Sequence, residues 1–212
     1  MKAQKTIVII VMTSMLSGCA FIQKAQRADE LEIENTNLRN RIAQLQKTKD
    51  REISDLEQAQ RELEESLKKE IGNYKAKLEM TERGLIITFV SEIFFDSGKD
   101  NVKQTGKTTL GKVAEVLNRD VPNSNVAVEG HTDNDPIKYS GWKSNWELSS
   151  ARALAVLHYL IGEGKVKPQR LSANGYGEFH PVAPNNTAQN KQKNRRVEIV
   201  ILPSKLSKVK PQ

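Results

Sequence analysis

A long stretch without proline is the feature that most constrains this chain. Residues 28–82 contain one glycine, Gly72, and are rich in Glu, Lys, Gln, Arg and Leu, which are strong helix formers. Apolar residues recur at steps of three or four, with an average of about 3.6 residues, the period of an α-helix. The stripe comprises Leu31, Leu38, Ile42, Leu45, Ile53, Leu56, Leu63, Leu67, Ile71, Tyr74 and Leu78. We therefore predict one long helix over residues 28–82, and roughly 50 helical residues span on the order of 75 Å.

The apolar stripe is narrow, and a helix this polar usually pairs with copies of itself in a coiled coil. Asn35, Lys49 and Gln60 interrupt the stripe and weaken such a seam. A solvated single helix, stabilised by charge pairs four residues apart, remains the alternative. Under either interpretation residues 28–82 form a stiff spacer, and self-association through this helix is the favoured one.

Residues 1–18 have the pattern of a secretory signal peptide. Lys2 and Lys5 precede an apolar run from Ile7 to Leu16, and the small residues Ser17 and Gly18 follow it. The run is shorter than the roughly 20 apolar residues that span a bilayer. Cys19, the only cysteine, comes next, and an odd thiol in an exported protein requires an explanation.

The segment Leu16-Ser17-Gly18-Cys19 resembles a bacterial lipobox. The resemblance implies cleavage before Cys19 and lipidation of its thiol and new amino group, with residues 19–27 as a lipidated N-terminus and short linker. Ala20, where inner-membrane lipoproteins often carry Asp, favours the outer membrane. A signal peptide cut elsewhere, leaving a free thiol, is the alternative.

The net charge of +7 admits a nucleic-acid partner, but the distribution of the charges argues against one. The basic residues are not interleaved with aromatic residues, and several lie at the chain ends. Lys205, Lys208 and Lys210 belong to a basic tail, residues 204–212, that we expect to be solvated.

Residues 84–203 predict a compact α/β domain. Strands are expected at 85–90, 125–130, 170–173 and 196–202, and amphipathic helices at 103–119 and 148–161. Leu154 is among the residues expected on the inward face of the second helix. The order β-α-β-α-β-loop-β predicts a mixed sheet with helices on one face.

Four segments of this domain resemble the OmpA-like family, which includes the C-terminal domain of outer-membrane protein A, peptidoglycan-associated lipoprotein and the stator protein MotB. They occur in family order, and their combination is far more specific than any one of them. They are Phe95-Asp96-Ser97, Glu129-Gly130-His131-Thr132-Asp133-Asn134, Asn145-Trp146-Glu147-Leu148-Ser149-Ser150-Ala151-Arg152-Ala153 and Asn194-Arg195-Arg196-Val197-Glu198.

The resemblance implies binding of diaminopimelate in the peptide stem of peptidoglycan. Asp133 would accept the ammonium of this zwitterion, and the planar fork of Arg152 suits its carboxylate. Backbone N–H groups near Leu148 would assist at the helix start. Thr132, Asn134 and Asn145 are expected as polar lining, with Asp96 and Arg196 as further candidates. Without the resemblance, an ordinary Asp133–Arg152 surface ion pair is the simpler interpretation.

No catalytic, cofactor or metal site is predicted. His131, His158 and His180 are the only histidines, and no two have metal-ligand spacing. There is no Gly-x-Ser-x-Gly elbow. We therefore expect a non-catalytic outer-membrane lipoprotein whose periplasmic domain tethers the membrane to peptidoglycan.

A MotB-like stator or envelope-machine component is the alternative, since the sequence of residues 144–149 is similar to that of MotB proteins. Such proteins have a transmembrane helix bearing an acidic residue, whereas the apolar run of this chain is short and contains neither Asp nor Glu.

Overall fold

The computed structural model describes the backbone of residues 2–138 and 140–203, with side chains from residue 26 on. The chain divides into two units, residues 1–50 and 51–212. Helix α1 (Lys2–Ser66) runs through residues 19–27 without a break, so the predicted linker is helical. The side chain of Cys19 and the basic tail lie outside the described residues, and their predicted roles stay predictions.

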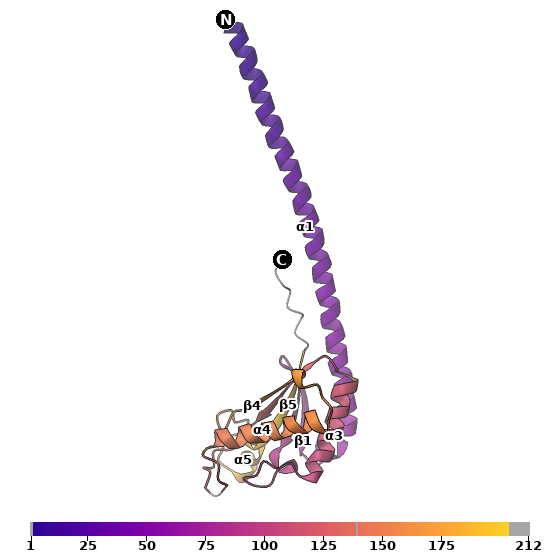
Figure 1. The fold of residues 1–212 in the computed structure, drawn as a ribbon, viewed down its shortest axis with the longest axis vertical. Helices are drawn as coiled ribbons and strands as arrows, with labels where there is room; N and C mark the ends of the chain where they lie inside the picture. The colour runs from indigo at the N-terminus through magenta and orange to yellow at the C-terminus, as the bar shows by residue number, and fades with distance from the viewer. Residues whose placement is uncertain (1, 139, 204–212) are drawn as a thin grey trace. The chain divides into compact units, whose positions relative to one another are not determined.

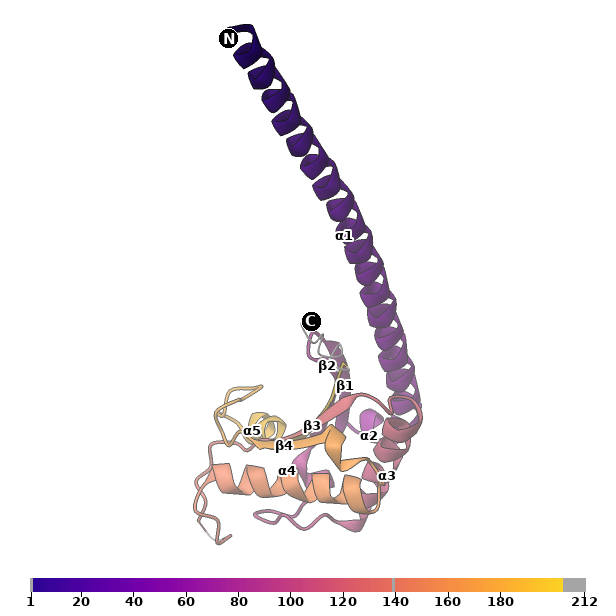
Figure 2. The ribbon, with the colours of Figure 1, turned by 45° about the horizontal axis from the view of Figure 1, so that its top comes forward.

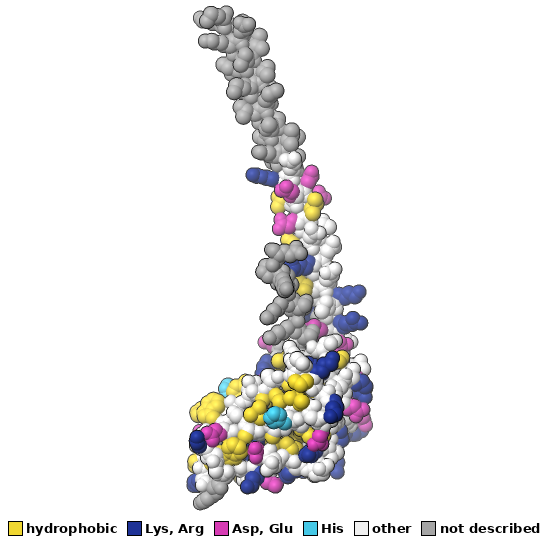
Figure 3. All heavy atoms as spheres, viewed as in Figure 1, with side chains coloured by type: hydrophobic (Ala, Val, Ile, Leu, Met, Phe, Trp, Pro, Cys, Tyr) yellow, Lys and Arg dark blue, Asp and Glu magenta, His cyan; other side chains and the backbone are white. Residues whose placement is uncertain are grey.

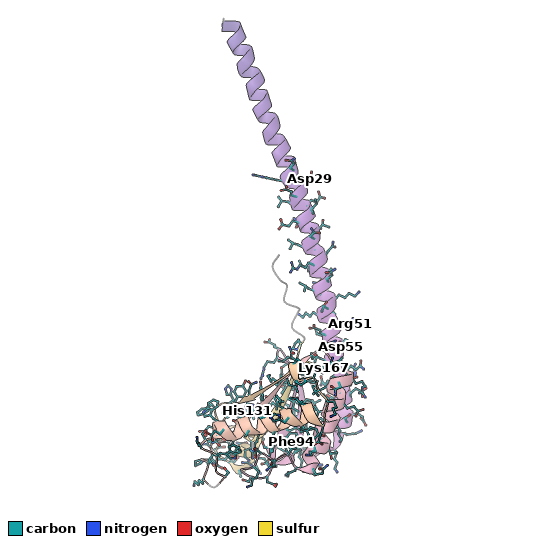
Figure 4. All side chains as sticks on the ribbon, in the orientation of Figure 1. Asp29, Arg51, Asp55, Phe94, His131 and Lys167 are labelled. Atoms are coloured by element: carbon teal, nitrogen blue, oxygen red, sulfur yellow. The ribbon has the colours of Figure 1, made fainter. Side chains whose placement is uncertain are left out.

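The described side chains of the first unit lie along α1 and are all exposed. Leu31 is 58% exposed, Leu38 49% and Ile42 53%. Figure 3 shows these apolar side chains among charged ones along the helix, and Figure 4 shows side chains projecting from all sides of it. The first unit therefore presents an apolar stripe with no partner among the described residues.

The end of α1 belongs to the core of the second unit. Leu56, Ala59 and Leu63 are buried there, as is Leu67 just after the helix. One apolar stripe thus has two environments: it is exposed in residues 26–50 and buried against the domain after residue 55. The domain begins well before Gly84, the boundary that the sequence predicted.

The predicted helix over residues 28–82 is wrong at its C-terminal end. Helix α1 ends at Ser66, the short helix α2 (Lys68–Gly72) follows, and β1 (Ala76–Thr81) is a strand. Tyr74, with the left-handed φ of 56°, lies in the turn between α2 and β1. Ala76, Leu78 and Met80 alternate with polar residues, which is the pattern of a strand, and this segment pairs with the neighbouring strand. The helical steps of the preceding stripe, which reach Leu78, concealed that pattern.

Five strands form one mixed sheet in the order β1-β2-β5-β3-β4. Strands β3 and β4 are parallel, and the other neighbours are antiparallel. The four strands after β1 are β2 (Gly84–Val90), β3 (Asn125–Gly130), β4 (Leu171–Gly175) and β5 (Arg196–Leu202). These four confirm the predicted strands, and β1 is an addition.

The main helices cover one face of this sheet, as predicted. Helix α3 (Gln104–Arg119), α4 (Asn145–Gly162) and the end of α1 share one buried cluster with the inward residues of β2, β3 and β5. Figure 1 shows α4 crossing the strands, and Figure 2 shows it beneath β3 and β4. Short helices complete the fold: η1 (Ser91–Ile93), η2 (Pro168–Arg170) and, within a predicted loop, α5 (Ala188–Asn194).

Helix α4 begins earlier than the sequence predicted, and its predicted inward face is right at Ala155, Leu157 and Leu160 but wrong at Leu154. Ser144 caps it, with its side chain accepting a hydrogen bond from the Glu147 N–H at 3.4 Å. Leu154, expected inward, is 46% exposed, whereas Ser149 and Arg152 are buried. The helix is therefore oriented by contacts at its first turns as well as by its apolar residues.

None of the helices, over the residues that the structure describes, combines the length and apolarity that a bilayer-spanning segment needs.

The two environments of α1 predict unequal costs for the same substitution. Leu63→Ala leaves a cavity in the core and should lower the free energy of unfolding by about 2–5 kcal/mol. Leu38→Ala, on the exposed part of the same helix, should change it by less than about 0.5 kcal/mol at a protein concentration at which the chain sediments as a monomer. Chemical denaturation followed by circular dichroism measures both. Equal effects would contradict the assignment of residues 51–66 to the domain.

Candidate ligand-binding site

A pocket of about 700 Å³ lies where β3 ends and α4 begins. The loop at 95–99 forms one wall, and the segment at 132–138 forms another. Ser91 and Glu92, Ser140, three residues of α4 and Arg195, just before β5, complete the lining; those of α4 are Asn145, Leu148 and Arg152. Ligand sites of open α/β sheets commonly lie at the carboxyl ends of strands.

Two glycines allow α4 to come this close to the sheet. A Cβ at Gly130, the last residue of β3, would lie 2.1 Å from the Ser149 carbonyl oxygen. A Cβ at Gly175, the last residue of β4, would lie 2.1 Å from the Ser150 hydroxyl. No other residue fits either position without moving the helix. This contact sets the distance between α4 and the strand ends, and therefore the width of the pocket.

Asp133 is buried at the pocket and paired with Arg195. Arg195 was not predicted as a site residue, whereas its neighbour Arg196 was. The Arg195 Nη1 donates to Asp133 Oδ2 at 2.7 Å, and its Nε and Nη2 donate to Glu92 Oε1 at 3.1 and 2.8 Å. Burial lowers the pKa of Arg195, but these hydrogen bonds to Asp133 and Glu92 outweigh burial and raise it above its usual value. Asp133 therefore forms its ion pair with Arg195 and not with Arg152, the partner that the simpler interpretation of the sequence gave it.

The candidate Arg196 lies on the opposite face of the sheet and does not line the pocket. Its Nε donates to Glu198 Oε1 at 2.6 Å, and its Nη1 donates to the His180 carbonyl at 3.1 Å. Successive side chains of a strand point to opposite faces. Val197, Ile199 and Ile201 are buried inward, so this alternation already assigned Arg195 to the inner face and Arg196 to the outer one.

Buried Asn194 holds the segment that precedes Arg195 and was also missed. Its Oδ1 accepts from the N–H groups of Val182 and Ala183 at 2.9 and 3.0 Å. Its Nδ2 donates to the Ala183 carbonyl at 2.8 Å and to Asn185 Oδ1 at 2.7 Å. These hydrogen bonds connect the residue before Arg195 to the loop at 182–185. No sequence pattern predicts them.

Arg152 is buried in the pocket wall, as expected of a ligand-binding arginine. Its Nε donates to the Lys99 carbonyl at 3.0 Å and its Nη2 to the Asp96 carbonyl at 3.3 Å, while its guanidinium lies 5.2 Å from the Phe95 ring centre. Burial lowers its pKa, yet arginine stays charged at neutral pH. Among the described residues, its Nη1 has no hydrogen-bond partner, and this nitrogen is left for an anion.

Two hydroxyls of the lining also have no partner among the described residues. Thr132 Oγ1 and Ser91 Oγ are buried and make no hydrogen bond there. A buried hydroxyl without a partner costs free energy, which a ligand that bonds to it recovers. Thr132 was predicted at the site, whereas Ser91 was not.

The other predicted residues divide between lining and surroundings. Asn145 lines the pocket, and its Nδ2 donates to the Asp135 carbonyl at 3.0 Å. Leu148 lines it with its side chain, but its N–H already donates to the Ser144 carbonyl at 3.2 Å and is not free for an anion. Asp96 lies at the rim, 3.5 Å from Lys103 Nζ. Asn134 is exposed and does not line the pocket.

The ionisable residues of the lining are balanced in charge. The acidic residues are Glu92, Asp96, Asp133 and Asp135, and the basic residues are Lys99, Lys138, Arg152 and Arg195. Such a pocket suits a ligand that carries both an ammonium and a carboxylate better than it suits a simple anion or cation. No histidine or cysteine is among the residues that line it.

On the outer face of the sheet, Glu129, His131 and Glu198 place their ligand atoms within 4.8 Å of one another. Sequence spacing did not reveal this cluster, because the fold assembles it from two strands. Glu129 pairs with Arg83 and Glu198 with Arg196, so both carboxylates are already neutralised. Burial and the nearby Arg196, His180 and Arg83 lower the pKa of His131 to about 3. The surroundings thus disfavour a further cation, and we assign no metal to the cluster.

Comparison with known proteins identifies the family. The sequence matches the OmpA family over residues 94–195. It is 31% identical to the cell wall anchor of the T6SS from Pseudomonas aeruginosa, with a TM-score of 0.60 over 66% of this chain and 96% of that chain. The chain belongs to the OmpA family. The OmpA-family match covers every lining residue except Ser91 and Glu92.

Two curated relatives extend the comparison of this OmpA-family chain. Motility protein B of Bacillus subtilis (strain 168) is 40% identical over 149 residues, which are 70% of this chain and 57% of that protein. Probable lipoprotein YiaD of Escherichia coli (strain K12) is 38% identical over 119 residues, which are 56% of this chain and 52% of that protein. The chain therefore spans less than two thirds of the length of either relative.

The depressed pKa of His131 predicts a loss of stability in acid. An unfolded histidine takes up a proton below about pH 6.5, whereas folded His131 resists protonation down to a pKa of about 3. The free energy of unfolding should therefore fall by up to about 1.4 kcal/mol per pH unit between about pH 6 and 4. Urea denaturation across this range measures the slope.

His131→Gln removes the titrating group. The free energy of unfolding should then fall less steeply with pH, by up to about 1.4 kcal/mol per pH unit, the contribution of one proton. His158→Gln, at an exposed position of α4, should keep the wild-type slope. If His131→Gln also keeps it, burial of a neutral His131 is not its cause.

Proposed function

We propose that this domain binds the peptide stem of peptidoglycan through the zwitterionic end of a diamino acid such as diaminopimelate. The observation that supports this most strongly is that Asp133 and the unpartnered Nη1 of Arg152 line one charge-balanced pocket. Asp133 accepts the ammonium, and Arg152 donates to the carboxylate. The OmpA-family membership and the cell-wall-anchor relative support the same ligand.

In this proposal binding is reversible, and no covalent bond is made or broken. Asp133 already pairs with Arg195, so the incoming ammonium shares a carboxylate that stays satisfied when the ligand leaves. Thr132 and Ser91 supply hydroxyls that gain a partner only in the complex. The similarity to a cell wall anchor supports a non-catalytic role.

Co-sedimentation with purified sacculi tests the ligand and its site. The chain from residue 20 on should appear in the pellet, whereas Asp133→Asn and Arg152→Ala should weaken binding at least about 10-fold, since loss of a charged hydrogen bond costs about 1.5–3 kcal/mol. Arg119→Ala removes an arginine outside the pocket and should bind as wild type does. Thermal unfolding checks that each variant folds. Normal binding by both folded pocket variants would refute the site.

We further propose that the chain is an outer-membrane lipoprotein that tethers the membrane to the wall. The lipobox-like segment ending at Cys19, with Ala20 after it, supports this, as does the similarity to the probable lipoprotein YiaD. The similarity to Motility protein B favours the second candidate, a stator or envelope-machine component held in the inner membrane. The two candidates differ in what anchors the N-terminus: acyl chains on Cys19, or the apolar segment itself.

Replacement of Cys19 separates these candidates. Under the lipoprotein proposal, wild type incorporates labelled palmitate and fractionates with outer membranes, and Cys19→Ala loses the label and leaves the membrane fraction or remains as uncleaved precursor. Under the stator proposal, Cys19→Ala stays in the inner membrane, and its mass differs from that of wild type only by the substitution itself. Fractionation on a sucrose gradient, with mass spectrometry of the N-terminal peptide, measures both.

We also propose that α1 self-associates through its exposed stripe. Leu31, Leu38, Ile42 and Leu45 are between 38% and 58% exposed and recur at coiled-coil steps, and a second copy would cover them. Sedimentation velocity of the chain from residue 20 on should give a dimer or trimer, and Leu38→Glu with Ile42→Glu should give a monomer. A monomeric wild type at about 100 μM would contradict the proposal and favour a solvated single helix.

A further inference from the structure

Two large aromatic rings are held together at the surface beside the pocket. Trp146, in the first turn of α4, is 48% exposed, and Phe179, after β4, is 60% exposed. The rings stack, with centroids 5.1 Å apart and planes 22° apart. By contrast Phe89, Phe94 and Phe95 are at most 2% exposed. The stacked pair, Trp146–Phe179, thus leaves apolar surface in water where the domain buries its other phenylalanines deeply.

The loop that carries Phe179 is fastened to α4 and to the end of β3. Gly177 lies beneath both rings at φ 56°, and a Cβ there would sit 3.5 Å from Trp146 and Phe179. Its N–H donates to Ser149 Oγ at 3.0 Å, and its carbonyl accepts from the Thr132 N–H at 2.9 Å. These bonds hold the stacked pair in place before any ligand arrives, so a ligand pays little to order it.

The stacked pair adjoins the pocket through Asn145, although neither ring is part of the pocket lining. Asn145 lines the pocket and directly precedes Trp146, so their Cα atoms are about 3.8 Å apart. The Asn145 Nδ2 also donates to Glu178 Oε2 at 2.6 Å, and Glu178 directly precedes Phe179. Asn145 therefore lies between the charged pocket and the two rings, Trp146 and Phe179. A ligand that fills the pocket and extends past Asn145 passes close to these rings.

We propose that the Trp146–Phe179 pair is a saccharide subsite that binds the glycan strand of peptidoglycan while the pocket holds its peptide stem. The inference rests on the proposed function. In peptidoglycan the diamino acid is the third stem residue from an N-acetylated hexosamine, and three residues span on the order of 10 Å. Such a sugar presents a face of C–H groups and an acetamide methyl, which stack on aromatic rings, while its hydroxyls stay in water.

Calorimetric titration of the full chain in detergent micelles, with two ligands, tests the subsite. One ligand is the stem tripeptide ending in diaminopimelate, and the other is the same tripeptide attached to its disaccharide. Wild type should bind the disaccharide-peptide about 3- to 10-fold more tightly than the free tripeptide. Trp146→Ala and Phe179→Ser should each abolish that difference and leave the affinity for the free tripeptide unchanged.

Tyr74→Asn is the matched control, because Tyr74 is an aromatic residue that is 93% exposed and lies outside the pocket lining. Asparagine tolerates its left-handed backbone, so this variant should keep the wild-type preference for the disaccharide. Phe179→Ser leaves α4 intact and keeps the test decisive if Trp146→Ala unfolds.

Each other outcome identifies what fails. If wild type binds both ligands equally, or both ring variants keep the preference, the saccharide subsite is wrong and the peptide pocket stands. If wild type binds neither ligand, the proposed function itself is wrong and the subsite falls with it. If the ring variants instead change only the sedimentation coefficient, the pair contacts a second copy of the chain, and the sugar assignment is overturned.

Discussion

The close contact between α4 and the ends of β3 and β4 is the constraint on which the site depends. Gly130 and Gly175 leave room for the backbone of Ser149 and Ser150 where a Cβ would overlap them. With the helix start so near, Arg152 reaches the carbonyls of the loop at 95–99, and Ser149 reaches the N–H of Gly177. The pocket and the neighbouring stacked pair thus both depend on one helix–sheet contact, and Asn145 lies between them.

Charge is divided between the two faces of the sheet by strand alternation. Arg195 joins Asp133 and Glu92 on the pocket side, while Arg196 joins Glu198 on the outer side near Glu129 and His131. The outer cluster pairs its carboxylates internally and keeps His131 neutral, so it contributes to the fold. Both nitrogens of His131 also lack a hydrogen-bond partner among the described residues, but it is the inner cluster that lines the pocket, where Arg152 Nη1 and two hydroxyls can reach a ligand.

The long helix has two roles because its apolar stripe has two environments. Residues 26–50 leave the stripe exposed, which is the basis for the proposed self-association. Leu56, Ala59 and Leu63 bury the same stripe in the domain core. The last turns of α1 therefore belong to the domain, and the residues before them are the part proposed to pair with a second copy of the chain.

The sequence by itself determined the family, the α/β order, the mixed sheet and the positions of Asp133 and Arg152, because periodicity and motif spacing are local properties. The alternation of apolar residues in the last strand also places Arg195 and Arg196 on opposite faces of the sheet. The charges of the two residues do not distinguish them. Only the tertiary structure decided that residues 76–81 form an edge strand, since their alternation suits a strand while the helical stripe before them continues to Leu78, and pairing with β2 supplies the difference. It alone decided which acid pairs with which base, that Ser91 faces the pocket, and that Phe179 returns to stack on Trp146. Those contacts join residues far apart in the chain, and their geometry depends on the close approach of α4 to the sheet.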